Sequence, residues 1–307
     1  MTPVFGSLLD KSTGWLGQRL VGTLLLPALA FWAGVGALVA THLGWTQVSA
    51  WWSALGGARQ ALASGGALTG LFVFVLLAKA VLPTLVRSYE GFWLLRGPAV
   101  RLGQLGVSRQ LKRWHRLQLT DPRDFGRRYR CFPPEPQDLL PTRLGNALRA
   151  AEFYASDSRR YGIDAVFFWP RLYPLLPDAL RGALGAARAS LEQFLVISSL
   201  SAAFVPVTAV LAAVLDLPVA VWLPVLTCTT LLSPLAYRAA VSAALSYSEL
   251  VRSAFDTHRR ALLAAMGLAL PETLEAERTL WQALGQQLYR RDTDRPDLIR
   301  FTTEAPA

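Results

Sequence analysis

The sequence predicts an all-α integral membrane protein with four transmembrane helices and a mostly helical cytoplasmic module. Two observations lead to this prediction. Apolar stretches at 20–43, 66–86 and 191–241 contain only two basic residues among them, Lys79 and Arg238. In contrast, 18 of the 31 lysines and arginines fall in the single connection that follows the second stretch. Helices of soluble proteins seldom run about 20 residues without a charge, so a membrane protein is favoured over a large soluble helical one.

The lengths of the apolar stretches set the number of spans. A helix needs about 20 mostly apolar residues to cross roughly 30 Å of hydrocarbon. The first two stretches have this length, whereas the third has about 50 residues and suits a hairpin of two helices. Asp216 and Pro218 place a charge and a helix breaker where a surface turn is needed. The spans are therefore expected at 20–43, 66–86, 191–215 and 218–240.

The distribution of basic residues predicts the orientation, because loops rich in Lys and Arg stay in the cytoplasm. Loop 44–65 has only Arg59 and the turn at Asp216 has no basic residue, whereas eight arginines follow Arg238. Both termini are therefore expected in the cytoplasm. The expected parts are a cytoplasmic N-terminal segment 1–19, two transmembrane helices with an external interfacial loop 20–86, a basic cytoplasmic connection 87–190, a transmembrane hairpin 191–240 and a cytoplasmic helical tail 241–307.

The composition indicates where this membrane is found. Arginine outnumbers lysine by 28 to 3, and alanine, leucine and glycine are abundant, as in proteins from GC-rich bacterial genomes. The bacterial cytoplasmic (inner) membrane is therefore the expected location. The net charge of +10 follows from the excess of basic residues on one side of the membrane and needs no nucleic acid to explain it.

Helical spacing predicts the elements before and inside the connection. In loop 45–65, apolar residues recur at helical spacing and three tryptophans suit the headgroup level, which favours an interfacial helix over an ordinary loop. Ser108 is a candidate N-cap for a short basic helix. The proline-rich segment 131–141 is typical of an extended linker, and Thr142 is a candidate N-cap for a helix over 143–155.

The rest of the module is expected to be helical apart from one aromatic segment. Segment 161–177 is broken by prolines and is either part of a folded core or a piece lying on the membrane. Helix 178–190 is expected to run into the third span, and the fourth span to continue to about Met266. After Pro271 a helix is expected from Glu272 to Arg290. Packing of this helix on the connection is favoured over a coiled coil, because its apolar seam is only two heptads long: Leu274, Trp281, Leu284 and Leu288.

The sequence offers no catalytic residues, no cofactor-binding motif and no metal ligands. The three histidines lie in three different regions, and none has a cysteine or histidine at metal-ligand spacing. Phosphate-binding and dinucleotide-binding glycine motifs are absent from the sequence, as is the nucleophile elbow of hydrolases. A non-enzymatic function is therefore favoured.

Four residues in the spans form a possible intramembrane polar site: Lys79, Glu192, Thr227 and Thr230. A charge inside a span is a functional candidate by default, and Pro83 lies one turn from Lys79. The alternative for Lys79 is that its long stem reaches the cytoplasmic surface. For the hydroxyls of the last two spans, the alternative is close helix packing and cross-helix hydrogen bonding.

A second candidate site is the segment 96–130, which has ten basic residues against Asp121 and Asp124. Anionic lipids of the cytoplasmic leaflet are the first expected partner, because each basic residue near such a surface contributes about 1 kcal/mol. An acidic protein or a nucleotide is the alternative, and nucleic acid is disfavoured because stacking aromatics are not interleaved with the charges. The contact residues predicted for a lipid or protein partner are Arg109, Lys112, Arg113, Arg116, Arg127, Arg128 and Arg130.

Two functions follow from these features. The first is a non-enzymatic bacterial inner-membrane scaffold or signalling component whose basic cytoplasmic module binds a partner. The second is a subunit of a homo-oligomeric ion channel or transporter. The order of two spans, a long cytoplasmic connection, a tight hairpin and a helical tail resembles the topology of bestrophin-type channels. Four spans enclose little room for a pore, so conduction would require an oligomer.

Overall fold

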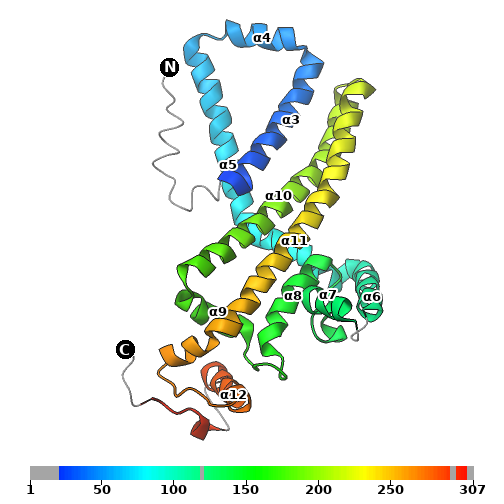
Figure 1. Cartoon of the computed structure of the whole chain (residues 1–307). Coiled ribbons are helices and arrows are strands. Elements are labelled where there is room, and N and C mark those ends of the chain that lie inside the picture. The colour runs from blue at the N-terminus through cyan, green and yellow to red at the C-terminus, as the bar shows by residue number, and fades with distance from the viewer. Residues whose placement is uncertain (1–20, 118–120, 291–294, 303–307) are drawn as a thin grey trace. The chain divides into compact units, whose positions relative to one another are not determined.

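The computed structural model describes residues 21–117, 121–290 and 295–302, and these residues are helical with no strand among them (Figure 1). The chain divides into two compact units. The first, here called the apolar unit, consists of Met1–Val86 and Ala189–Ala240. The second, here called the basic unit, consists of Arg87–Arg188 and Val241–Ala307.

Four helical segments are long and apolar enough to cross a membrane, as the sequence predicts. Three of them, helices α5, α10 and α11, contribute residues to both units. The expected uninterrupted helix from residue 178 through the third span is confirmed, as is the continuation of the fourth span to about residue 266. The four segments are Gly22–Leu43, Gly57–Glu90, Asp178–Val214 and Val219–Ala265.

The first two long helices are joined by a short one. A π-helical turn η1 (Val21–Leu25) leads into α3 (Leu26–Leu43), and Gly44, with a φ of 85°, separates α3 from α4 (Trp45–Ala54). Helix α5 then runs over Gly57–Glu90. The predicted helix in loop 45–65 is therefore present as α4 in the first half of that loop, whereas the second half forms the start of α5.

Helix α5 begins nine residues before the predicted start of the second span, at Gly57 instead of residue 66. The intervening residues include three alanines, a glutamine and a leucine, which are good helix formers and extend the apolar helix backwards. The corner before them is held by Gln60, whose side-chain amide donates a hydrogen bond of 2.8 Å to the carbonyl oxygen of Trp52.

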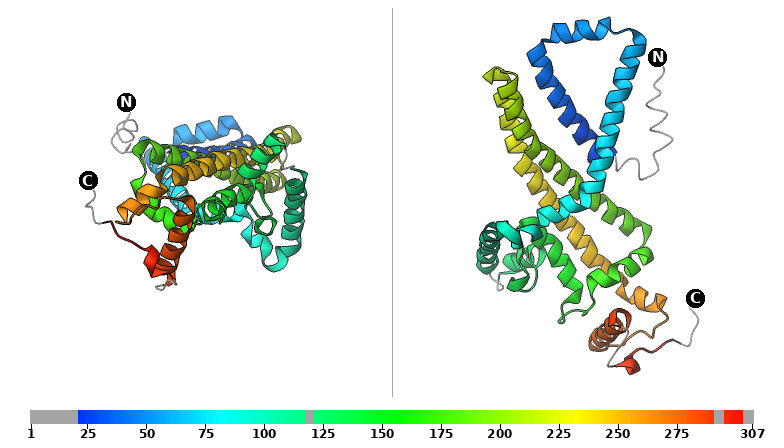
Figure 2. Two further views of the ribbon diagram at one scale, coloured as in Figure 1. Left: turned by 60° about the horizontal axis from the view of Figure 1, so that its bottom comes forward. Right: turned by 180° about the vertical axis from the view of Figure 1, so that it is seen from behind.

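The hairpin of α10 (Asp178–Val214) and α11 (Val219–Ala265) turns where the sequence predicts. Asp216 has a φ of 49°, and the backbone N–H of Leu217 donates to the carbonyl oxygen of Ala212 at 3.1 Å. This pattern satisfies the last carbonyls of α10, and Pro218 then prevents the helix from continuing. Inside the apolar unit the two helices lie side by side (Figure 2).

Small residues hold the apolar unit together. Ser198 of α10 and Ser233 of α11 each donate a hydrogen bond of 3.0 Å to the other's carbonyl oxygen. Gly34 of α3 lies against Phe204, and a Cβ at this position would be 2.8 Å from the ring. The hydroxyls of this hairpin therefore include at least one pair used for packing. Between 6 % and 33 % of the most apolar part of each of the four long helices is buried within the chain, so a single chain leaves most of this apolar surface exposed.

The basic unit is built from shorter helices around one core. It contains the second part of α11 and the first part of α10, together with α6 (Val100–Arg116), α7 (Pro122–Cys131), α8 (Arg143–Ser156), α9 (Ala165–Leu172) and α12 (Leu274–Arg290). Short 3-10 turns link them: η2 (Phe92–Leu95), η3 (Gly97–Ala99), η4 (Pro136–Asp138), η5 (Tyr173–Leu175) and η6 (Pro296–Leu298).

The aromatic segment 161–177 belongs to this core. Phe168 and Leu172 of α9 are fully buried, and the Phe168 ring meets the Trp281 ring edge-on at 5.1 Å. Trp281 is on α12 and is itself buried beside Phe255 of α11. Of the two alternatives for the aromatic segment, these contacts support the folded core. They also confirm that the last helix packs on the connection.

The helix caps correct two predictions. Thr142 does cap α8, because its hydroxyl accepts a hydrogen bond of 3.0 Å from the N–H of Gly145. Ser108 caps nothing: it lies in the middle of α6, which begins at Val100, and its hydroxyl donates to the carbonyl oxygen of Leu105. Helix α12 begins at Leu274 instead of Glu272, since the Thr273 hydroxyl accepts from the N–H of Ala276.

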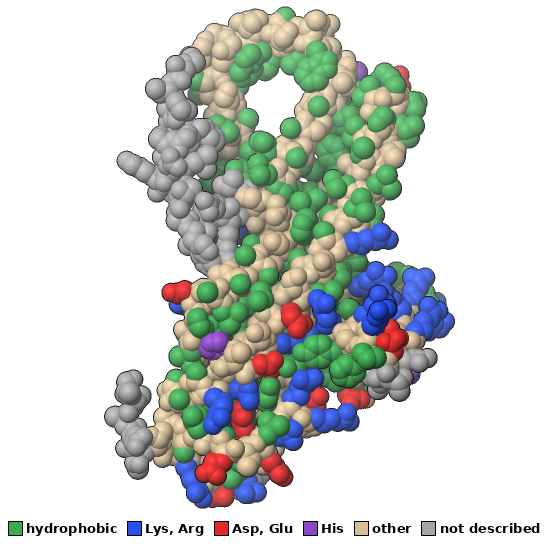
Figure 3. Space-filling model, viewed as in Figure 1, with side chains coloured by type: hydrophobic (Ala, Val, Ile, Leu, Met, Phe, Trp, Pro, Cys, Tyr) green, Lys and Arg blue, Asp and Glu red, His purple; other side chains and the backbone are tan. Residues whose placement is uncertain are grey.

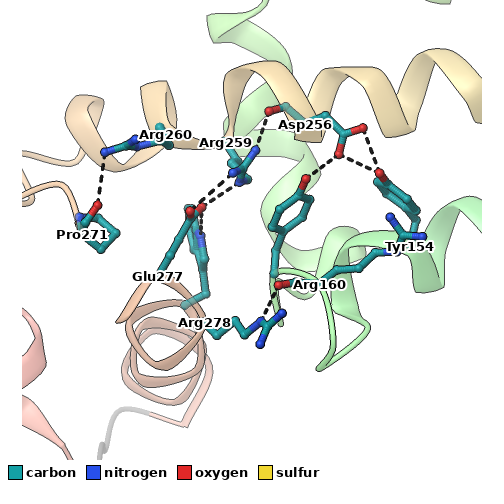
Figure 4. Close-up of polar contacts among 10 residues, drawn as sticks. Tyr154, Arg160, Asp256, Arg259, Arg260, Pro271, Glu277 and Arg278 are labelled. Atoms are coloured by element: carbon teal, nitrogen blue, oxygen red, sulfur yellow. Dashed lines mark hydrogen bonds and ion pairs between the residues drawn. The ribbon is translucent and has the colours of Figure 1, made fainter. Parts of the chain in front are cut away.

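A polar network on α11 joins it to α8 and α12 (Figure 4). The Asp256 carboxylate accepts hydrogen bonds of 2.8 Å from the hydroxyls of Tyr154 and Tyr161. One turn further, Arg259 forms an ion pair of 2.7 Å with Glu277 of α12. Burial, followed by the bond to Asp256, raises the pKa of the Tyr154 hydroxyl, so this donor stays protonated at neutral pH.

Candidate functional site

A pocket of about 550 Å³ opens in the basic unit among α6, α7, α8 and α11. Four of its lining residues are arginines: Arg113, Arg116, Arg127 and Arg143. In the view of Figure 3, Lys and Arg side chains gather over the basic unit, whereas the apolar unit presents mainly hydrophobic side chains. The pocket is therefore a concave part of a strongly basic surface.

Helix α6 supplies one wall of the pocket, because two glycines let it pack closely against the segments that contain Leu94 and Pro141. A Cβ on Gly103 would overlap the carbonyl oxygen of Leu94, and a Cβ on Gly106 would be 2.7 Å from Pro141. Gln110, Arg113 and Leu117 follow at spacings of three and four residues, which places them on one face of the helix. That face lines the pocket.

Helix α7 supplies Arg127 and Cys131, which lie one turn apart. Its start is fixed by Asp121, whose carboxylate accepts a hydrogen bond of 2.8 Å from the N–H of Arg123. The neighbouring residue Arg128 stacks on α6: its guanidinium lies 3.4 Å from the centre of the Trp114 ring. Arg128 therefore joins the two basic helices.

Helix α8 presents Arg143 at its first position. The preceding turn is locked by Asn146, which is fully buried and whose side-chain amide bonds both the N–H and the carbonyl oxygen of Leu140 at 2.7 and 2.9 Å. Thr142 also donates to the carbonyl oxygen of Glu90 at 2.9 Å. A basic residue in the first turn of a helix opposes the helix dipole, so the position of Arg143 has an electrostatic cost.

The four arginines share the pocket without an acidic residue among its described lining residues. Burial lowers the pKa of the Arg113 guanidinium, and the positive charge of Arg143 lowers it further. This repulsion is the electrostatic signature of a site that favours an anion.

Two uncharged polar groups also line the pocket. Gln110 is 7 % exposed, and its Oε1 atom has no hydrogen-bond partner within the described part of the chain. A buried polar atom without a partner costs about 1–3 kcal/mol. Burial raises the pKa of the Cys131 thiol, although the positive charges of Arg130 and Arg113 oppose that shift. Cys131 is therefore a thiol, not a thiolate, at neutral pH.

The seven basic residues predicted from the sequence to contact a partner fall into three groups in the structure. The fold brings Arg113, Arg116 and Arg127 together in the pocket. Arg109, Lys112 and Arg130 are exposed and do not line it, and Arg128 stacks on Trp114. Sequence reasoning missed Arg143 and Gln110. The spacing of Gln110 to Arg113 is visible in the sequence, but the distant Arg143 is brought to the pocket only by tertiary structure.

The predicted intramembrane residues lie on three helices of the apolar unit: Lys79 on α5, Glu192 on α10, and Thr227 and Thr230 on α11. Lys79, Thr227 and Thr230 are exposed, and Glu192 is half-buried. The Thr227 hydroxyl donates to the carbonyl oxygen of Leu223 within its own helix. Within the described ranges, no ion pair joins Lys79 to Glu192.

Comparisons with known protein families, with curated proteins and with solved structures find no match to this chain. Among the described residues, no group of three or more His, Cys, Asp or Glu side chains is placed to hold a metal ion. The arginine-lined pocket is therefore the feature of the described residues that points most directly to a function.

Proposed function

We propose that this protein is a non-enzymatic scaffold or signalling component of the bacterial inner membrane that recognises an anionic partner through its basic cytoplasmic module. The observation that carries the proposal is the arginine-lined pocket, where four arginines line one volume without an acidic neighbour among the described lining residues. Guanidinium groups bind carboxylates and phosphates through paired N–H donors. An anionic partner would supply the missing counter-charge.

The apolar unit anchors this module to the membrane in the proposed arrangement. Its four helices have the length and composition of membrane spans. The excess of Lys and Arg in the basic unit would keep that unit on the cytoplasmic side, together with both termini. Binding of the partner would then take place next to the inner leaflet.

The exposed face of the α5–α6 region supports contact with anionic lipids. Leu102 and Leu105 of α6 are 64 % and 55 % exposed, and Trp93 just before them is 56 % exposed. Arg101 and Arg109 of the same helix are also exposed. Apolar side chains beside basic ones are typical of an interfacial helix that lies on an anionic leaflet. None of these residues lines the pocket.

A homo-oligomeric channel or transporter subunit is the second candidate, and one observation favours it. Lys79 lies on an apolar span with its side chain exposed in the single chain. A charge that faces lipid is costly, and a neighbouring copy would cover it. The size of the detergent-solubilised particle tests this candidate: a monomer or dimer would contradict it, because four or eight spans enclose little room for a pore.

The anion-binding proposal is tested by thermal unfolding of the full-length protein in a neutral detergent. Pyrophosphate, citrate and an oligoglutamate peptide serve as anionic probes. At least one of them is expected to raise the Tm of the wild type. The increase should be lost when Arg113 and Arg143 are both replaced by alanine. It should be kept in the matched variant Arg101→Ala with Arg159→Ala, whose residues are exposed and do not line the pocket. Equal stabilisation of both double variants would contradict the proposal.

A further inference from the structure

We infer that the anion bound in the arginine-lined pocket is the phosphate group of a small organic compound whose body rests on the apolar part of the same pocket. This inference rests on the proposed function and names the chemical class of its ligand.

The density of positive charge favours a phosphate over a carboxylate. Arg113, Arg116, Arg127 and Arg143 all line a single volume of about 550 Å³. A carboxylate brings one negative charge, whereas a phosphate monoester brings about 1.5 to 2 charges and three acceptor oxygens at pH 7. The four arginines come from three different helices, α6, α7 and α8, and so approach the pocket from several directions. The three free oxygens of a tetrahedral phosphate offer acceptors in as many directions. A planar carboxylate has only two oxygens to share among four arginines.

The size of the pocket favours a small compound. Sites for small molecules have volumes of roughly 300–1,000 Å³, and this pocket lies in that range at about 550 Å³. An acidic protein helix is about 10 Å in diameter and would need a longer groove.

Part of the pocket lining is apolar. Ala147 of α8 and Val241 and Leu245 of α11 form it together with Phe132, which is buried. An inorganic phosphate would leave this surface without a partner. A phosphorylated compound with a flat or apolar body would cover it, as most ligands of mainly apolar pockets do.

Gln110 provides a contact for the body of that compound. It lines the pocket, it is more than nine-tenths buried, and its Oε1 has no partner within the described part of the chain. A hydrogen-bond donor on the ligand, such as an amine, amide or hydroxyl, would satisfy this atom. Arginine cannot replace it, because guanidinium groups donate and do not accept. The pocket therefore has separate contacts for a phosphate and for a polar edge.

The test measures affinity with the full-length protein in neutral detergent, using adenosine monophosphate as a phosphate with a flat, polar-edged body. Pyrophosphate serves as a phosphate without a body, and citrate as a carboxylate of comparable charge. Adenosine monophosphate is expected to bind at least about tenfold more tightly than citrate, the difference that one charge-assisted hydrogen bond makes.

Variants separate the two contacts. Arg113→Ala with Arg143→Ala should abolish binding of both phosphates, whereas Arg101→Ala with Arg159→Ala, two exposed positions that do not line the pocket, should leave it unchanged. Gln110→Leu should lower the affinity for adenosine monophosphate about tenfold and leave the affinity for pyrophosphate within twofold of the wild-type value. Loss of both ligands in Gln110→Leu would remove the assignment of Gln110 to the body of the ligand.

A phosphate monoester can come from a soluble compound or from a lipid headgroup, and a second arm distinguishes them. The protein is placed in nanodiscs of phosphatidylcholine with or without phosphatidic acid. Competition between phosphatidic acid and pyrophosphate, lost in the Arg113 and Arg143 double variant, would identify the lipid as the source. Unchanged pyrophosphate affinity would identify a soluble compound.

The outcomes also separate this inference from the proposed function. If citrate binds the pocket as tightly as adenosine monophosphate, the phosphate assignment is wrong and the anion-binding function stands. If no anion binds in a way that depends on Arg113 and Arg143, the inference and the proposed function both fail.

Discussion

Arg143 shows how a single residue can oppose two local rules. It is the first residue of α8, where the helix dipole favours a negative charge, and its own charge disfavours that of Arg113. Proteins keep such residues mainly at functional sites. The four-arginine pocket therefore contains a local cost that an anionic ligand would offset.

Replacing Arg143 should reveal that cost. Arg143→Gln is expected to raise the free energy of unfolding without ligand by up to about 1 kcal/mol at low salt, the scale of an exposed charge pair. The gain should shrink as salt screens the repulsion. Arg149→Gln is the matched control on the same helix, because Arg149 lies 3.6 Å from Asp138 and its loss should destabilise. Denaturant unfolding at two salt concentrations measures both. A destabilised Arg143→Gln variant would contradict this argument.

Cys131 should respond to pH as a buried thiol. Burial raises its pKa above the ordinary value, so the reactive thiolate is scarcer at pH 8 than in a free cysteine. In a Cys228→Ser background, the alkylation rate of Cys131 is expected to be below that of a cysteine peptide at pH 8. It should keep rising beyond pH 9. A rate that reaches its plateau below pH 8 would show a lowered pKa and contradict this expectation.

At the scale of elements, the glycines of α6 decide whether this helix can form the pocket wall. Gly103→Ala is expected to destabilise the protein by at least about 1–3 kcal/mol, the range of overpacking, because its Cβ would overlap backbone atoms of Leu94. Gly126→Ala on α7 is the control. Nothing lies within 4 Å of a Cβ there, so a gain of about 0.5–1 kcal/mol is expected from helix propensity. Denaturant midpoints measure whether each variant loses or gains stability. A gain in stability for both variants would contradict the close approach of α6.

The outer face of α6 should bind membranes without supporting the fold. Changing Leu102 and Leu105 to serine removes two exposed apolar side chains, so stability should change by less than about 0.5 kcal/mol. The variant should contact the lipid headgroups less, so spin-labelled lipids should quench a fluorophore on this face less strongly. The measurement is the quenching of a fluorophore attached to Gln104→Cys, in a background without native cysteines, in nanodiscs containing anionic lipid. Quenching equal to that of the unsubstituted helix would exclude membrane contact by this face.

How much of the fold follows from sequence differs between the two units. Helical length, the turn at Asp216 and the cap at Thr142 were predictable, because each depends on local chemistry: apolar runs, a helix breaker and a hydroxyl before a helix. The predicted start of α5 is nine residues too late, because the apolar run begins at residue 66 whereas the helix-forming residues begin at Gly57. Ser108 was misread as a cap because serine also lies in helix interiors, bonded to the preceding turn.

The candidate site was predictable only in part, for a physical reason. Charge density along the chain identified the basic segment, and three of its arginines do line the pocket. The concave shape depends on contacts between distant segments: Gly106 against Pro141, and Val241 and Leu245 brought beside α6. No local pattern encodes those contacts. Arg143 and Gln110 therefore emerge only from the tertiary structure.

At the scale of the whole molecule, the positive-inside bias predicts which surfaces reach the cytoplasm. Eighteen basic residues lie in the connection 87–190, while loop 44–65 has one. In a background without Cys131 and Cys228, single cysteines at Gly56 and Val219 should react with a membrane-impermeant reagent added to intact cells. Both positions are exposed, and a Cβ on Gly56 meets nothing within 4 Å.

Single cysteines at Gln137 and Tyr289 complete this test. Both side chains are exposed in the basic unit, so labelling depends on the side of the membrane and not on burial. They should react only after permeabilisation. Labelling at Gln137 in intact cells would place the arginine-lined pocket outside the cell. That result would overturn the cytoplasmic assignment of the module, and with it the expectation that the pocket meets cytoplasmic phosphates, while leaving the four-helix apolar unit as it is.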